Sequence, residues 1–236
     1  MKETTNIEMS SMDKMMQVMA KMMWMPSVVM GLLIVLISLY IGWQNSQDIS
    51  EWLSNSKLVR DTAEAGSTLA LQKASIESTF AWLPGFKFLG MGLLFSGIVF
   101  LLATIIGALR QAGVTVQKAA GVQPKVLVKP MTGKLFPMFM MLGLIILIIN
   151  FIVDLNLAAQ ASSYWNHNIK GELDAAGSGS ELLDQLSSIQ STKAWVEPLK
   201  FVGLAFLFTS IALALATIRK ILGFQARRMA EIVEGK

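Results

Sequence analysis

Side chains that could do chemistry are scarce in the apolar parts of this sequence. Ser38 and Asn150 lie within two long apolar segments, whereas Asp154, Lys87 and Lys200 stand at the ends of such segments. Polar and ionisable groups at membrane depth are costly and often mark a solute or ion pathway. These five residues are therefore candidates for a solute or ion entrance, in which Asp154 pairs with Lys87 or Lys200. The alternative is that the lysines snorkel beside a wetted helix end.

Methionines recur at helical spacing near the N-terminus, at Met12, Met16, Met19 and Met23. Several thioether groups on one helix face could bind Cu(I), which prefers soft ligands. Because neither cysteine nor histidine accompanies them, we favour a flexible apolar face that packs on the membrane or on another subunit. We expect no metal site and no cofactor.

Residues for covalent or metal catalysis are also few. The chain has no cysteine, and its one histidine, His167, is expected to be a solvated loop residue. The motifs of nucleotide-binding proteins, zinc proteases and serine hydrolases do not occur in the sequence. The sequence therefore predicts a protein that is not an enzyme.

Composition indicates an integral membrane protein. Hydrophobic residues make up 53% of the chain, charged residues only 15%, and the mean hydropathy is +0.54. A membrane-spanning helix needs about 20 apolar residues. Four segments without a charged residue have close to that length: 22–44, 88–109, 135–153 and 201–218.

Tryptophans stand near the ends of these four segments, where amphipathic rings favour the membrane interface. They are Trp24, Trp43, Trp82 and Trp195. We interpret them as interface anchors in preference to a ligand cage.

The chain contains an internal duplication. Residues 75–109 recur as residues 188–222, and every match, such as Trp82 with Trp195, lies 113 positions apart. Roughly half of these positions are identical, which indicates a repeat. The same offset continues in the loops before them: Trp52 matches Trp165, Asn55 matches Asn168, and Asp61 matches Asp174. These loop residues could share a binding role, or they could survive only because the duplication is recent.

Charge distribution predicts the orientation of the chain. Lysines and arginines gather in the segment 110–134 and in the tail 223–236, whereas the loops 44–81 and 155–194 lean acidic. Basic loops remain in the cytoplasm. We therefore expect both termini in the cytoplasm of a multi-pass protein of the cell (inner) membrane, with the two acidic loops outside. The basic balance is explained by this topology and does not indicate nucleic acid.

The predicted fold is all-α, with four transmembrane helices from two tandem repeats of the same orientation, related by a twofold axis along the membrane normal. The expected parts are a cytoplasmic amphipathic Met-rich interfacial helix (1–25), which ends where Pro26 starts the first span, repeat 1 (26–109), a basic cytoplasmic linker (110–134), repeat 2 (135–222) and a basic cytoplasmic tail (223–236). Each outer loop is expected to form a small helical cap, whose second helix starts near Ser67 or Ser180.

Three functions fit this sequence. The first is a non-catalytic, structural or accessory subunit of a larger membrane protein complex, with membrane lipids and other subunits as partners. The second is a small-solute transporter or channel built from the duplicated hairpin. The third is a membrane sensor whose outer helical cap binds a ligand.

Overall fold

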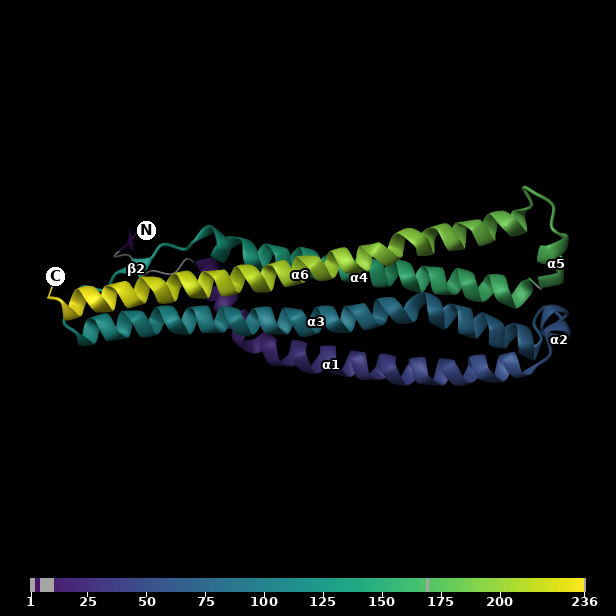
Figure 1. Ribbon diagram of the computed structural model, residues 1–236, viewed down its shortest axis with the longest axis horizontal. Coiled ribbons are helices and arrows are strands. Elements are labelled where there is room, and N and C mark those ends of the chain that lie inside the picture. The colour runs from purple at the N-terminus through teal and green to yellow at the C-terminus, as the bar shows by residue number, and fades with distance from the viewer. Residues whose placement is uncertain (1–2, 5–10, 169, 236) are drawn as a thin grey trace. The chain divides into compact units, whose positions relative to one another are not determined.

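A computed structural model of the chain describes residues 3–4, 11–168 and 170–235. Figure 1 shows its elements in chain order. They are β1 (Glu3–Thr4), α1 (Ser11–Ser54), α2 (Lys57–Asp61), α3 (Thr68–Ala119), β2 (Val126–Leu127), α4 (Met131–His167), α5 (Lys170–Ala175) and α6 (Glu181–Val233). The chain is therefore almost entirely helical, and β1 and β2 form one short antiparallel pair.

Four of the helices are long and apolar enough to cross a membrane: α1, α3, α4 and α6. Each contains one of the uncharged segments identified in the sequence, so the prediction of four candidate spans is confirmed. Each is also longer than the segment alone, at 37 to 53 residues. Because a bilayer core needs only about 20 helical residues, each of these helices is longer than a membrane crossing requires.

The helices α3 and α6 begin as the sequence predicted. The hydroxyl of Ser67 accepts a hydrogen bond from the backbone N–H of Ala70 at 3.3 Å, and that of Ser180 accepts one from Leu183 at 3.5 Å. A capping side chain of this kind satisfies an N–H group that the first helical turn leaves unpaired. Before each cap stands a glycine with positive φ, Gly66 at 72° and Gly179 at 80°. Both helices then continue without interruption into the apolar segments.

The predicted boundary at Pro26 is wrong. Helix α1 runs from Ser11 to Ser54 with Pro26 inside it, so the methionine-rich stretch and the first apolar segment form one helix. Proline removes one backbone hydrogen bond, but helices of membrane proteins tolerate it because neighbouring groups satisfy the freed carbonyl. The other long helices also contain a proline without ending there: Pro84 lies inside α3, Pro137 inside α4 and Pro198 inside α6.

The chain divides into two compact units, and each long helix contributes to both. Unit 1 contains the residues up to Met30, Gly92–Leu144 and the residues from Ala205 onward. Unit 2 contains Gly31–Met91 and Ile145–Leu204. Each unit therefore combines parts of both predicted repeats.

In unit 1, helix α3 approaches α1 closely and also contacts α6. A Cβ atom added at Gly97 would lie 2.5 Å from Cγ2 of Val28 and 3.0 Å from the carbonyl oxygen of Trp24. The rings of Phe95 and Phe208, which are equivalent positions of the two repeats, have centroids 4.7 Å apart. Gly97 is thus required where the backbone of α3 meets the backbone of α1.

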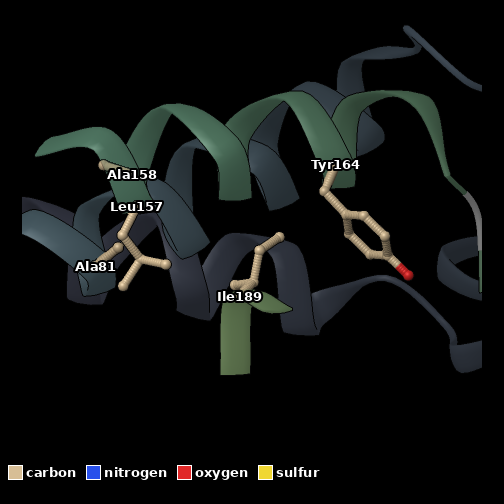
Figure 2. Close-up of a cluster of buried hydrophobic side chains, with 5 residues drawn as sticks. All are labelled: Ala81, Leu157, Ala158, Tyr164 and Ile189. Atoms are coloured by element: carbon tan, nitrogen blue, oxygen red, sulfur yellow. The ribbon is translucent and has the colours of Figure 1, made fainter. Parts of the chain in front are cut away.

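Unit 2 has a small apolar core under its two outer loops. Figure 2 shows Ala81 of α3, Leu157, Ala158 and Tyr164 of α4, and Ile189 of α6. Tyr164 lies at one end of this cluster, and its hydroxyl points away from the other four residues. Five partly buried residues pack against the core: Trp82, Trp165, Leu173, Leu182 and Leu186. The core is thus built mainly by the loop 155–194, and α3 adds Ala81 and Trp82 to it.

Candidate functional site

A cavity of unit 2 lies between the loops 44–81 and 155–194, and we name it the cap pocket. Its volume is about 430 Å³. It is lined by Trp52, Arg60, Asp61, Ala63, Leu69, Ala70, Lys73, Trp165, Asn168, Leu173, Asp174, Leu183 and Leu186. This combination of apolar walls and a few polar groups is typical of small-molecule sites.

Two cations lie over the indole rings of the cap pocket. The guanidinium carbon of Arg60 is 4.5 Å from the centroid of Trp52. The Nζ atom of Lys73 is 4.9 Å from the centroid of Trp52 and 5.0 Å from that of Trp165. A cation held within about 6 Å of an aromatic face gains electrostatic energy from the ring. The two matched tryptophans thus hold the positive groups of the pocket in place.

Several residues that line the cap pocket form pairs 113 positions apart in the sequence, and two of these pairs differ in charge. Trp52 and Trp165 are equivalent, as are Asp61 and Asp174. In contrast, Arg60 and Lys73 in the first repeat correspond to leucines in the second, at positions 173 and 186. Both basic residues that line the pocket, Arg60 and Lys73, therefore come from the first loop, while each loop also contributes one aspartate.

The repeat-matched asparagines have a structural role at helix ends. The side-chain amide of Asn55 donates to the carbonyl oxygen of Glu51 at 3.2 Å, at the end of α1. That of Asn168 donates to the carbonyl oxygen of Tyr164 at 2.9 Å, at the end of α4. Both carbonyls also accept a second hydrogen bond, Glu51 from the hydroxyl of Ser54 and Tyr164 from the backbone N–H of Asn168, so the asparagines reinforce the helix ends. Asn168 also lines the cap pocket, whereas Asn55 does not.

A buried ion pair lies elsewhere in unit 2, between α4 and α6. The Nζ atom of Lys200 is 3.4 Å from Oδ2 of Asp154, and the two side chains are only 3% and 1% exposed. Lys200 also pairs with Glu197, whose side chain is 53% exposed, at 3.1 Å. A Cβ atom added at Gly85 would lie 1.9 Å from Oδ2 of Asp154, so α3 leaves space for this carboxylate. Lys87, the second partner considered for Asp154, is exposed.

The other two polar candidates, Ser38 and Asn150, are buried. The hydroxyl of Ser38 donates to the carbonyl oxygen of Ile34 in its own helix at 2.7 Å. The amide of Asn150 donates across helices to the carbonyl oxygen of Val196 at 3.0 Å. The structure therefore does not bring the five candidates together at one entrance: two form an ion pair, and Asn150 joins α4 to α6.

The methionine face, which we predict to pack on the membrane or on another subunit, is largely exposed on this chain. Met19 and Met23 are 47% and 45% exposed, whereas Ala20 is fully buried. Met16 is half-buried and lines a small cavity of unit 1. Met12 lies outside the residues whose side chains the structure describes. The packed side of this part of α1 thus carries a small residue, and two of the candidate copper ligands point outward.

The four tryptophans predicted as interface anchors differ in burial. Trp43 and Trp195 are 60% and 53% exposed, whereas Trp24 and Trp82 are partly buried. Trp82 packs against the apolar core of unit 2. Trp43 and Trp195 therefore suit contact with lipid headgroups, and Trp82 contributes to packing as well.

Arg60 and Lys73 were not singled out from the sequence. The only signal for them was their position. Arg60 precedes Asp61 and Lys73 follows Leu69, both of which recur in the second loop, but Arg60 and Lys73 themselves do not recur.

Among the described residues, no group of three or more His, Asp or Glu side chains could hold a metal ion. Comparison with protein-family models, curated proteins and solved structures finds no significant match for this chain.

Proposed function

We propose that this protein is a non-catalytic integral membrane subunit, which serves as a structural or accessory component of a larger membrane protein complex. The observation that supports it is that buried polar side chains form hydrogen bonds between the long helices. Asn150 bonds the backbone of α6, the hydroxyl of Ser210 donates to the carbonyl oxygen of Phe136 at 2.6 Å, and that of Thr217 donates to Thr132 at 2.8 Å. Interhelical bonds of this kind hold membrane helices together.

Apolar surface is available for the proposed partners. On α1, large side chains such as Leu32, Leu36 and Leu39 are 50% or more exposed. Such a surface is compatible with membrane lipid and with the apolar face of another membrane subunit. We propose both as partners.

The same proposal includes the arrangement of the chain in the inner membrane. Two tandem hairpins of equal orientation place both termini and the basic linker in the cytoplasm and both caps outside. Contacts between equivalent residues support a twofold relation, because such residues meet at a twofold axis. In unit 2 the rings of Phe88 and Phe201 are 5.2 Å apart, and in unit 1 Phe95 meets Phe208.

Co-purification tests the subunit role. When the protein is extracted from its native membrane in a mild detergent, we expect it to migrate with a fixed set of other membrane subunits. A discrete particle that contains only copies of this chain would contradict the proposal and favour the transporter.

Replacement of Asn150 separates these two functions further. Asn150→Leu removes one interhelical hydrogen bond, so we expect a loss of about 0.6–2 kcal/mol in the free energy of unfolding and an unchanged set of partners. Thermal unfolding in detergent and co-purification measure the two effects. Ser38→Ala is the control, because that hydroxyl bonds only its own helix. A folded Asn150→Leu protein that keeps its partners but loses solute uptake in proteoliposomes would instead indicate a transporter.

A further inference from the structure

The cap pocket has the size and walls of a ligand site. Pockets for small molecules measure about 300–1,000 Å³ and are mostly apolar, and the cap pocket has about 430 Å³. All of its lining residues belong to unit 2. Its apolar wall includes Leu69, Leu183 and Leu186. A ligand in this pocket would thus bury an apolar body against leucine and indole surfaces.

The charged groups of the pocket differ in how they are neutralised. The carboxylate of Asp61 is 3.3 Å from Nζ of Lys57, and that of Glu77 is 2.6 Å from Nζ of Lys73. In contrast, no described carboxylate lies within ion-pair distance of Arg60, whose guanidinium lies over Trp52. Arg60 is therefore the cation of the pocket that has an aromatic face but no counter-charge among the described residues.

One nitrogen of Arg60 also lacks a hydrogen-bond acceptor. Its Nε atom is buried and forms no hydrogen bond with a described residue. A buried donor without an acceptor is costly, and a guanidinium matches the two oxygens of a carboxylate in geometry. Two carboxylates, those of Asp61 and Asp174, also line the pocket, and that of Asp61 is already paired with Lys57.

We infer that the cap pocket binds a small organic anion with an apolar body, such as a medium-chain carboxylate. The carboxylate pairs with Arg60, and the hydrocarbon part packs on the pocket's leucines, Leu173, Leu183 and Leu186. The charge difference between the repeats fixes this orientation, because the positions equivalent to Arg60 and Lys73 are leucines. Ligand binding here is independent of the proposed subunit role.

The experiment is calorimetric titration of the whole protein in phosphatidylcholine nanodiscs with octanoate, octylammonium and octanol, with empty nanodiscs as the blank. We expect saturable binding of octanoate at one site per chain, and much weaker binding of the cation and of the alcohol. Arg60→Leu, which installs the residue found at the equivalent position of the second repeat, should weaken octanoate binding about 10- to 100-fold, the usual loss of a charge-assisted hydrogen bond. Lys193→Leu, at an exposed position of α6 outside the pocket, should leave binding unchanged.

Arg60→Lys keeps the charge but loses the planar fork, so we expect it to bind octanoate with an intermediate affinity. If Arg60→Leu does not fold, as judged by circular dichroism, Arg60→Lys and the three ligands on the natural protein still decide the question. Equal binding of all three compounds, preferential binding of octylammonium, no saturable binding of octanoate, or normal binding by a folded Arg60→Leu protein would each overturn the inference.

Discussion

Lys200→Met is expected to lower the free energy of unfolding by about 3–5 kcal/mol, which is the usual cost of removing one partner of a buried ion pair. The side chain of Asp154 is 1% exposed and lies 3.4 Å from Nζ of Lys200. Without the lysine, a buried carboxylate remains with no cation beside it. Thermal unfolding of the purified protein in detergent should therefore show a large decrease in melting temperature.

The sequence match at an offset of 113 positions provides a matched control for this substitution. Lys87 occupies the equivalent position of the first repeat but is exposed, so Lys87→Met should change the unfolding free energy by less than about 0.5 kcal/mol. Asp154→Asn combined with Lys200→Met should recover much of the lost stability, because the buried charge is then absent. Equal effects of Lys200→Met and Lys87→Met would contradict the importance of the ion pair.

Gly97→Leu is expected to have the second largest effect, a loss of about 1–3 kcal/mol from overpacking. Even a Cβ atom at this position would lie 2.5 Å from Cγ2 of Val28 and 3.0 Å from the backbone nitrogen of the same residue. A backbone atom cannot move aside as a flexible side chain does, so α1 and α3 must separate locally. Thermal unfolding measures the loss.

Gly223→Leu is the control for this substitution. Gly223 lies within α6, and among the described residues a Cβ atom there would meet no atom within 4 Å apart from its chain neighbours and the local helix backbone. Because leucine has a higher helix propensity than glycine, by up to about 1 kcal/mol, we expect an unchanged or slightly more stable protein. If both leucine variants were equally stable, the close packing of α1 on α3 would be wrong.

Local sequence patterns were sufficient to locate the four long helices and the starts of two of them. Uncharged segments of about 20 residues identify the candidate spans, and the serines at positions 67 and 180 mark the starts of α3 and α6 because capping is a local interaction. The break expected at Pro26 was wrong because a proline within an apolar helix can be accommodated by its neighbours. The methionine face remains a prediction, because Met19 and Met23 are exposed on this chain, an arrangement compatible with contact to lipid or to another subunit, while Ala20 packs inside the protein.

The candidate site depends on tertiary contacts, and the sequence left these open. Lys87 and Lys200 are equivalent in the repeats, so the pattern could not decide which one pairs with Asp154. The packing of α4 against α6 does so. Similarly, Arg60 and Lys73 can be recognised as candidate site residues only in the folded protein, where two loops far apart in the chain and two tryptophans enclose the same cavity. Spacing within one loop does not contain that information.

The central proposal is that two membrane hairpins face the same way, with both caps outside and the linker and tail in the cytoplasm. The natural chain has no cysteine, so single cysteines can be introduced and labelled. Suitable exposed positions are Ala65 and Ser178, which are equivalent in the two caps, Gln123 in the linker and Val233 at the end of α6. With a membrane-impermeant maleimide, we predict that in intact cells or spheroplasts Ala65→Cys and Ser178→Cys are labelled, whereas Gln123→Cys and Val233→Cys react only after lysis. Labelling of the two caps from opposite sides of the membrane, or of one cap together with the linker, would contradict the proposal.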